Sequence, residues 1–506
     1  KNGSANWKLQ IFADGGTPDV SISAGSGAVS IAGNASNIAK LSISSNSSTA
    51  SAISGSLSGS MSLAKLGTGD LVLGSTNTYS GGTTVNNGIL TLGSNNALGT
   101  GNITVNGGGT LDLAGKSLTT ATQALTLSGL GFLPSGAATG QNLGALRNSS
   151  AGSASVVAGN ITLKSPRDGN GNVLTAGEGA SVGGSGNISL SGVISGTTGE
   201  NNGLDKRGPG TVTLINSGNT FTGAAVIRGG TLALGDVAGN ALASSSRINV
   251  LAGATLDTRT GINTSVTTGS GSNATTTVTD TTGTGSSGRT VSIKSLAGDI
   301  ASTVQLQADQ TLRITNGLAS DTFAGVISNR TVAASNNIGG LGGVQVAGGT
   351  LTLSGANTYT GTTSVLNQST LRLTGSGDIS ASRAVNADIT ASFDISGLTG
   401  AGTTFKEFSA AGYNGSYASN PVGVGTLGTF NLGNKTLTID ARQFQTTSNT
   451  TTVTSGLITA TTVVSESVAL PVVNLLSFTG SGGAIRKTGA GQLQLAGHNT
   501  YTAGTR

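Results

Sequence analysis

Short runs in which apolar and polar residues alternate recur along the chain. Typical runs cover residues 71–73, 89–92, 231–234 and 350–353, and Gly and Asn lie at their ends. Alternation with a period of two places one set of side chains on a core and the other set toward solvent, as in a short, half-buried strand. No stretch combines helical periodicity with capping residues. We therefore expect an almost wholly β fold.

One longer pattern occurs four times. A strand of the form Gly-x-Leu-x-Leu precedes a turn of the form Asn-Thr-aromatic-Thr/Ser-Gly, and a second Gly-x-Leu-x-Leu strand follows. The copies cover residues 65–93, 206–235, 345–373 and 487–506, and the last one stops at Arg506 before its second strand. Asn suits a left-handed or side-chain-bonded corner, and Gly permits positive φ. Each copy therefore predicts two strands joined by a tight corner.

The turn residues are the candidate sites of this sequence, and we expect them to be structural. The aromatic ring is expected to cover the corner of a coil, and the alternative is a platform on which a ligand stacks. The eight residues are Asn77, Tyr79, Asn219, Phe221, Asn357, Tyr359, Asn499 and Tyr501.

Two spacings define the architecture. Equivalent strand positions recur at a short interval, as from Leu71 to Leu90 and from Val212 to Leu232. A chain that returns to the same register after about 20 residues forms one coil of a solenoid, with parallel strands stacked roughly 4.8 Å apart. The four turn asparagines follow one another at a longer and nearly even interval. We expect one continuous, right-handed parallel β-helix over residues 1–506, built from modules of about 140 residues that each contain several coils.

Composition narrows the functional classes. Gly makes up 84 of 506 residues and charged residues only 9%, but 35% of residues are apolar and lie in alternating runs, which favours a folded chain over a disordered linker. The absence of Cys excludes disulfides, thiol catalysis and Cys-based metal sites. The net charge of +5 includes no basic run, and no apolar stretch is long enough to span a membrane. Nucleic acid is therefore not an expected partner.

The first copy, Lys65-Leu66-Gly67-Thr68-Gly69-Asp70-Leu71-Val72-Leu73 followed by Asn77-Thr78-Tyr79-Ser80-Gly81-Gly82-Thr83-Thr84-Val85, resembles the passenger-associated transport repeat, also called the autotransporter-associated β-strand repeat. The third copy has Gln345 in place of the opening Lys. The resemblance covers about a fifth of the chain. It implies a right-handed β-helix, type V secretion, and display on the outer membrane or release from it. The signal peptide and the translocator barrel of that family are absent from this sequence, so we expect a piece of a longer protein.

Candidates for catalysis and metal binding are few. Asp236 and Asp257 have the spacing of neighbouring coils that a glycosidase pair would need. Asp112 and Asp257 occupy similar module positions, which favours a structural role. The single His498 lies in a corner, and residues 168–172 match only the start of a calcium loop. We expect no enzyme activity, no metal and no cofactor.

Three segments interrupt the coil pattern and are expected to be loop insertions, at residues 261–288, 400–424 and 446–462. The second holds the densest group of aromatic residues, namely Phe405, Phe408, Tyr413 and Tyr417. The function expected overall is a non-catalytic extracellular scaffold, the shaft of a bacterial surface adhesin or fibre. Its partners would be further copies of itself, other surface proteins, or glycans and proteins of host or neighbouring cells. The alternatives are a polysaccharide-acting β-helix enzyme and a receptor-binding module that uses protruding loops.

Overall fold

The structure is a computed structural model, and it describes residues 17–382 with gaps at 139–140, 166–178, 198–199, 201–202, 259–288 (apart from two strands), 308, 330–340, 367 and 380; beyond residue 382 it describes only strands. The chain divides into two compact units. Unit 1 comprises Lys1–Ser246 and Ala254–Thr284, and unit 2 comprises Arg247–Gly253 and Gly285–Arg506. The described residues contain strands and no helix, and therefore no helix that is long and apolar enough to cross a membrane.

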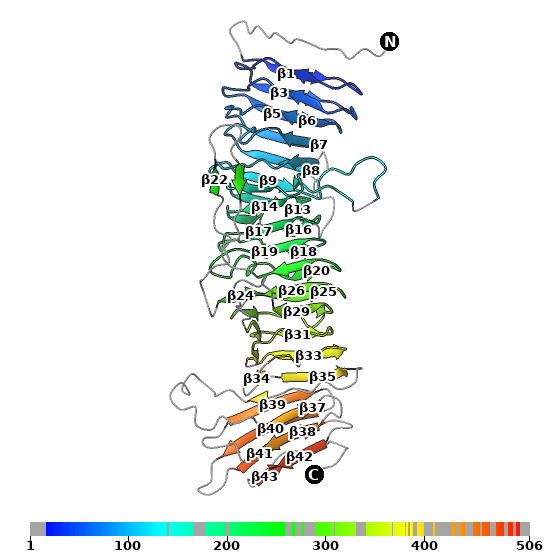
Figure 1. The fold of residues 1–506 in the computed structure, drawn as a ribbon, viewed down its shortest axis with the longest axis vertical. Helices are drawn as coiled ribbons and strands as arrows, with labels where there is room; N and C mark the ends of the chain where they lie inside the picture. The colour runs from blue at the N-terminus through cyan, green and yellow to red at the C-terminus, as the bar shows by residue number, and fades with distance from the viewer. Residues whose placement is uncertain are drawn as a thin grey trace. The chain divides into compact units, whose positions relative to one another are not determined.

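Unit 1 is a stack of short strands (Figure 1). They are β1 (Asp19–Ser23), β2 (Ser30–Ile31), β3 (Lys40–Ser44), β4 (Ser51–Ile53), β5 (Ser62–Leu66), β6 (Asp70–Leu73), β7 (Thr83–Leu92), β8 (Ile103–Asp112), β9 (Leu125–Ser128), β10 (Leu146–Asn148), β11 (Ala154–Val157), β12 (Ile161–Lys164), β13 (Ala180–Gly184), β14 (Asn187–Leu190), β15 (Ile194–Gly196), β16 (Leu204–Arg207), β17 (Thr211–Leu214), β18 (Ala225–Ile227), β19 (Thr231–Leu234), β21 (Thr255–Asp257), β22 (Val266–Thr268) and β23 (Thr275–Thr277).

Apart from the β22/β23 hairpin, these strands pair in parallel, each with its equivalent in the next coil. One ladder runs β1–β3–β5–β7–β8–β9–β12–β15. A second runs β4–β6–β7–β8–β10–β13–β16–β18. A third runs β11–β14–β17–β19–β21. The long strands β7 and β8 each take part in two ladders, because their two halves lie on either side of a corner. Unit 1 is thus a parallel β-solenoid, as the sequence predicts.

Coil length follows from the register. Regular coils are short, since Leu71 pairs with Leu90 and Val182 pairs with Lys206. The step from Leu111 to Leu146 is longer, because a loop is inserted there. The predicted period of about 20 residues therefore holds for the regular coils. Insertions lengthen single coils without disturbing the strand stack, because a loop at a corner leaves the ladder hydrogen bonds intact.

Unit 2 contains β20 (Ile248–Val250), β24 (Thr290–Ile293), β25 (Leu296–Gly298), β26 (Thr303–Leu306), β27 (Thr311–Ile314), β28 (Thr322–Phe323), β29 (Val326–Asn329), β30 (Gly343–Val346), β31 (Thr350–Leu353), β32 (Thr363–Val365), β33 (Thr370–Gly375), β34 (Val385–Ala387), β35 (Ser392–Leu398), β36 (Phe408–Ser409), β37 (Gly428–Asn431), β38 (Thr436–Asp440), β39 (Asn449–Ser455), β40 (Ile458–Ser465), β41 (Val472–Thr479), β42 (Ala484–Thr488) and β43 (Gln492–Leu495). Parallel ladders again run through it, as in β24–β27–β30–β32–β34 and β20–β25–β28–β31–β33–β35.

The later strands of unit 2 depart from this pattern. Strands β36–β37–β38 and β39–β40–β41 pair antiparallel, and β38 and β41 then pair in parallel with β42 and β43. Ser455 pairs with Ile458, so only Gly456 and Leu457 separate β39 from β40. The segment expected as a loop at 446–462 therefore contains hairpin strands, and the segment at 261–288 contains the β22/β23 hairpin.

The core of the solenoid consists of apolar ladders. In one ladder of unit 1, residues from successive coils stack in register and are almost fully buried; they are Leu71, Leu90, Leu111, Leu146 and Val182. Each such side chain stabilises the fold by about 1.5–3 kcal/mol. The next residue of this ladder is Lys206, followed by Ile227. An interior lysine in an apolar ladder is the first feature that needs a chemical explanation.

Candidate functional site

The described turn asparagines, Asn77, Asn219 and Asn357, are buried and connect three coils each. The Asn77 Oδ1 accepts a hydrogen bond from the Leu57 amide at 2.7 Å, and its Nδ2 donates to the Ala97 carbonyl at 2.6 Å. Asn219 does the same with the Ile194 amide and the Ala241 carbonyl. An amide side chain supplies a donor and an acceptor at opposite sides, so it replaces the ladder bonds that are interrupted at a corner.

In the third copy, the Asn357 Oδ1 accepts from the Ile327 amide, and its Nδ2 donates to the carbonyls of Gly355 and Asp378. The predicted structural role therefore has a defined chemistry at three of the four copies. Asn499 and Tyr501 lie outside the described residues.

The aromatic residues of the turn point into the core. Tyr79 is 0% exposed, and Phe221 and Tyr359 are 1% exposed, so these rings are not available as a platform for a ligand. The Tyr79 hydroxyl is hydrogen-bonded to Thr83, and the Tyr359 hydroxyl to Thr363. Burial raises the pKa of both phenols well above the usual value of 10. The rings fill the corner from the inside instead of covering it from the outside.

The residue four positions after the ring varies together with the ring. Where the ring is Phe221, which has no hydroxyl, the partner position holds Ala225 instead of Thr. A buried hydroxyl without a partner is unfavourable, so Tyr with Thr and Phe with Ala are the two compatible pairs. The sequence of the fourth copy has Tyr501 with Thr505, which is the first of these pairs.

The opening lysine of the repeat is also an interior residue. Lys65 and Lys206 are each 1% exposed. The Lys65 Nζ donates to the carbonyls of Leu66, Gly67 and Asn87 at 2.7, 2.8 and 3.1 Å. An ammonium group has three N–H donors, so all of them are used.

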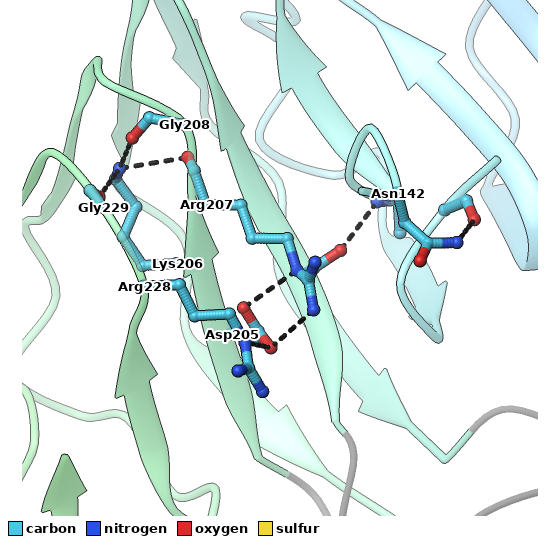
Figure 2. A network of polar contacts seen from close by, with 10 residues as sticks. Asn142, Asp205, Lys206, Arg207, Gly208, Arg228 and Gly229 are labelled. Atoms are coloured by element: carbon cyan, nitrogen blue, oxygen red, sulfur yellow. Dashed lines mark hydrogen bonds and ion pairs between the residues drawn. The ribbon is translucent and has the colours of Figure 1, made fainter. Parts of the chain in front are cut away.

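Lys206 repeats this arrangement in the second copy, and Figure 2 shows its amine beside Gly208 and Gly229. Its Nζ donates to the carbonyls of Arg207, Gly208 and Gly229 at 3.0, 2.8 and 2.7 Å. Desolvation by burial lowers the pKa of both lysines to about 8, against the weaker opposing effects of Asp70 on Lys65 and of Asp205 on Lys206. Each lysine thus joins the corners of two successive coils by donating to carbonyls of both.

The third copy shows what replaces the lysine. The sequence pattern aligns Gln345 with Lys65, but the structure aligns Val346 with it: Val346 pairs with Val365 as Lys65 pairs with Val85. Val346 is 0% exposed, and Gln345 is only partly buried. On the next strand, Leu71 is the sixth residue after Lys65, whereas Leu351 is the fifth residue after Val346. The corner that has a lysine is therefore one residue longer, and the lysine binds the carbonyls of that longer corner.

A row of arginines lies on the outer face of the second ladder of unit 1. Register places Arg147 beside Gly183 and Gly183 beside Arg207, and Arg228 directly follows the next strand, β18. Two aspartates bind these arginines: Asp112 is the register partner of Arg147, and Asp205 stands two residues before Arg207 on β16. Asp112 accepts from the Arg147 Nε at 2.7 Å and from the amides of Ala114 and Ser149. We call Arg147, Arg207 and Arg228 the arginine row.

Asp205 holds the other end of the row (Figure 2). It accepts from the Arg207 Nε at 3.1 Å, from the Arg207 terminal nitrogen at 3.2 Å and from the Arg228 Nε at 2.7 Å. The Asp205 side chain is 6% exposed, whereas that of Arg228 is 37% exposed. The carboxylate is therefore covered, and the guanidinium group of Arg228 faces solvent in a fixed orientation.

A protruding arm at residues 129–145 borders the row, and it is the cyan loop that extends from unit 1 in Figure 1. Its two limbs are joined by the Leu143 amide on the Phe132 carbonyl and the Gly144 amide on the Leu130 carbonyl. Its base is attached to β13, where the Ser181 amide donates to the Gly129 carbonyl at 3.0 Å. Ser181 is the register partner of Asp205. Leu133 near the tip is 37% exposed.

The residues that the sequence offered as candidates for catalysis, metal binding or recognition lie outside the arginine row. Asp257 pairs with Ala233, three residues before Asp236, so the two carboxylates are not at one register position as a glycosidase pair on neighbouring coils would be. Asp236 is 1% exposed and accepts from the amides of Asn240 and Ala241. The calcium-like segment at 168–172 and His498 lie outside the described residues, and nothing is described of the side chains of Phe405, Phe408, Tyr413 and Tyr417.

The sequence did not lead us to predict the buried position of Lys65 and Lys206, the arm or the arginine row. A signal for the lysine was present, because in a chain with 9% charged residues Lys65 and Lys206 each stand two positions before a glycine of the motif. The arginine row had no such signal. Its members are unevenly spaced in the sequence, since the intervening coils differ in length.

Comparison with protein families identifies the passenger-associated-transport-repeat at residues 63–92, 204–234, 348–373 and 485–506. These segments make up about a fifth of the chain and overlap the four motif copies. A curated relative is described as "Adhesin BmaC autotransporter" from Brucella suis biovar 1 (strain 1330). It is 31% identical in an alignment that covers 66% of this chain and 11% of the relative. The chain thus spans about a ninth of that relative's length. No solved structure matches the chain.

Proposed function

We propose that this chain, an autotransporter passenger with four passenger-associated transport repeats, is a shaft segment of a surface adhesin. As such a passenger it is displayed on the bacterial cell surface or lies outside the cell. In this proposal the stacked coils provide length and rigidity, and binding occurs on arms and faces of the coils. The function is mechanical and adhesive, without catalysis.

The observation that carries the proposal is the structural use of the polar residues of the repeat. The described turn asparagines, the two interior lysines and the tyrosine hydroxyls all hydrogen-bond to neighbouring coils or to their own corner. A polar core of this kind fixes the register between coils. These buried residues are therefore not accessible to a substrate, which supports a scaffold role for the repeated part of the chain.

Attachment and hydrolysis assays test the proposal together. Beads coated with the purified chain should attach to host or bacterial cells more often than beads coated with an unrelated β protein of similar size. Incubation of the chain with bacterial and host polysaccharides should release no new reducing or unsaturated ends. Equal attachment of both bead types would refute the adhesive role, and release of sugar ends would show that the chain is an enzyme.

Self-association is part of the same proposal. Electron micrographs of the chain, taken over a hundredfold range of concentration, should show whether single particles join into filaments. The support for association is the scarcity of charge, since exposed strands in other proteins are kept apart by charged residues, lysine above all. Particles that stay single at the highest concentration would remove this part of the proposal.

A further inference from the structure

The arginine row and the arm beside it form a surface whose ligand nothing so far assigns. We propose that this surface binds a linear polysaccharide that carries carboxylate or sulfate groups. The inference rests on the adhesive function proposed above and names the class of ligand. Four observations support it, and they concern orientation, spacing, charge and the border of the surface.

The aspartates fix the orientation of the arginine side chains. The Arg228 Nε is bound to Asp205 at 2.7 Å, and among the described residues no hydrogen-bond acceptor is assigned to its two terminal nitrogens. Both Arg147 contacts that the structure assigns also go to a single oxygen of Asp112, each at 2.7 Å. A guanidinium group that is held through one edge presents its remaining donors in a fixed fork. This fork matches carboxylate and sulfate oxygens, and little side-chain entropy is lost on binding.

The stacked strands set the spacing between the arginines of the row. Arg147, Gly183 and Arg207 occupy consecutive strands, and Arg228 directly follows the next one, so the row extends over three strand spacings, or roughly 14 Å. Gly183 adds no side chain to the row, which leaves an interval between Arg147 and Arg207. A row of charges along the solenoid axis, with a gap inside it, fits a linear polymer with repeated anionic groups better than a single compact anion.

Charge and border complete the surface. Arg207, Arg228 and Asp205 together carry one net positive charge. Arg147 and Asp112 balance each other, and the Asp70 carboxyl lies within electrostatic range of this pair, so the positive end of the row is the one at Arg207 and Arg228. The Ser181 amide donates to the Gly129 carbonyl, and Ser181 is the register partner of Asp205, so the base of the arm borders one side of the row. Leu133 of this arm is 37% exposed. A loop held beside a rigid strand scaffold is a common place for a binding site.

The test measures binding of the full chain to three immobilised polymers by biolayer interferometry. They are polygalacturonate, which carries carboxylates, dextran sulfate, which carries sulfates, and neutral dextran. We expect binding to one or both anionic polymers, weakened as salt rises from low to physiological concentration, and none to dextran. Preference for one anionic polymer identifies the group that is recognised. Binding to neither polymer, or equal binding to dextran, would overturn the inference.

Arg228→Gln is the diagnostic variant because Arg228 is the most exposed member of the row and Asp205 keeps Arg207 as its partner. Its affinity should fall by about tenfold, as expected from the loss of one charge-assisted contact. Arg228→Lys should recover part of this loss, since it keeps the charge and loses the fork. The matched control is Arg313→Gln on β27, which removes the same charge from another exposed strand position and should change affinity by less than about twofold.

An equal loss in the Arg228 and Arg313 variants would show charge attraction without a site, and it would refute the proposal. The bead assay separates the two levels of the argument. If beads coated with the wild-type chain attach to cells but the chain binds neither anionic polymer, the adhesive function stands and this ligand class is wrong. If those beads do not attach, the adhesive function itself fails, whatever the polymers show.

Discussion

Substitution of Lys65 by Met is the sharpest test of the chemistry inside the repeat. Met fills a similar volume and is compatible with the apolar ladder, but it donates no hydrogen bond. The carbonyls of Leu66, Gly67 and Asn87 would lose the donor they share at 2.7–3.1 Å. Three charge-assisted hydrogen bonds at the low end of their range, about 1.5 kcal/mol each, would give a loss of about 4–5 kcal/mol.

Part of this loss is recovered, because the variant no longer buries an ammonium group. Desolvation is the main reason why the pKa of Lys65 falls to about 8, and a buried charge is unfavourable even when it is paired. We therefore expect the free energy of unfolding to fall by about 2–3 kcal/mol. Because coils of a solenoid interact mainly with their neighbours, the effect should be greatest in the coils that contain Lys65 and Asn87.

Urea denaturation followed by far-UV circular dichroism measures the global effect, and hydrogen exchange of the amides at 62–92 measures the local one. The control is Lys40→Met, the same change at an exposed position of β3, which should alter stability by no more than about 0.5 kcal/mol. If Lys65→Met is as mild as Lys40→Met, or if its exchange rates rise uniformly along the chain, the reasoning about the lysine and its carbonyls is wrong.

The same repeat leads to three further predictions. Phe221→Tyr should cost about 1–3 kcal/mol by burying an unpaired hydroxyl, and adding Ala225→Thr should recover about 1 kcal/mol or more; a double-mutant cycle in urea measures this coupling, and zero coupling would contradict the pairing. Val346→Lys should destabilise unit 2 by more than about 2 kcal/mol, since the shorter corner there lacks the extra residue of the corners that hold a lysine. A smaller loss of stability than that of Val346→Ala would show that a corner of this length can also hold a lysine. The free energy of unfolding is expected to rise with pH in one range and to fall with pH in the next. With the pKa of Lys65 and Lys206 at about 8, the unfolded chain binds more protons than the folded chain between about pH 8 and 10.5, so stability rises across that window. Above pH 10 the unfolded chain loses tyrosine protons first, because the pKa of Tyr79 and Tyr359 is raised in the fold, and stability falls again. Urea midpoints measured at several pH values should thus pass through a maximum near pH 10, and the double variant Lys65→Met/Lys206→Met should lack the rise.

The solenoid could be predicted from the sequence because the pattern that indicates it is local and occurs many times along the chain. Alternation in runs such as 89–92 reports which side chains face inward, and the interval from Leu71 to Leu90 reports one coil directly. The antiparallel strands β39 and β40 were harder to foresee, since a Thr-rich run has the same alternation in either strand direction. Only the two-residue spacing between Ser455 and Ile458 distinguishes a hairpin from a coil.

The lateral surface could not be read from the sequence, for a geometric reason. Arg147 and Arg207 lie two strands apart in space but far apart in the chain, because the coil from Arg147 to Gly183 is much longer than the one from Gly183 to Arg207. A search for charges at a fixed period of about 20 residues, which suits a regular repeat, passes over such a row. The role of Val346 was hidden in a similar way, since an alignment without gaps places Gln345 at its position, and only the strand register corrects it.

The link between corner length and the interior residue has a consequence for how such chains change over generations. A single-residue deletion in the corner after Lys65 would leave a charged amine with too few acceptors, and a lone change of that lysine to Val would leave carbonyls unmatched. Each step alone is harmful, so a lineage that gains both must pass through a weakened intermediate or copy an intact block that already has them. Exchange of whole blocks between chains, with crossover points outside the corner, avoids that barrier. Engineers who splice such coils should likewise transfer the corner and its interior residue together.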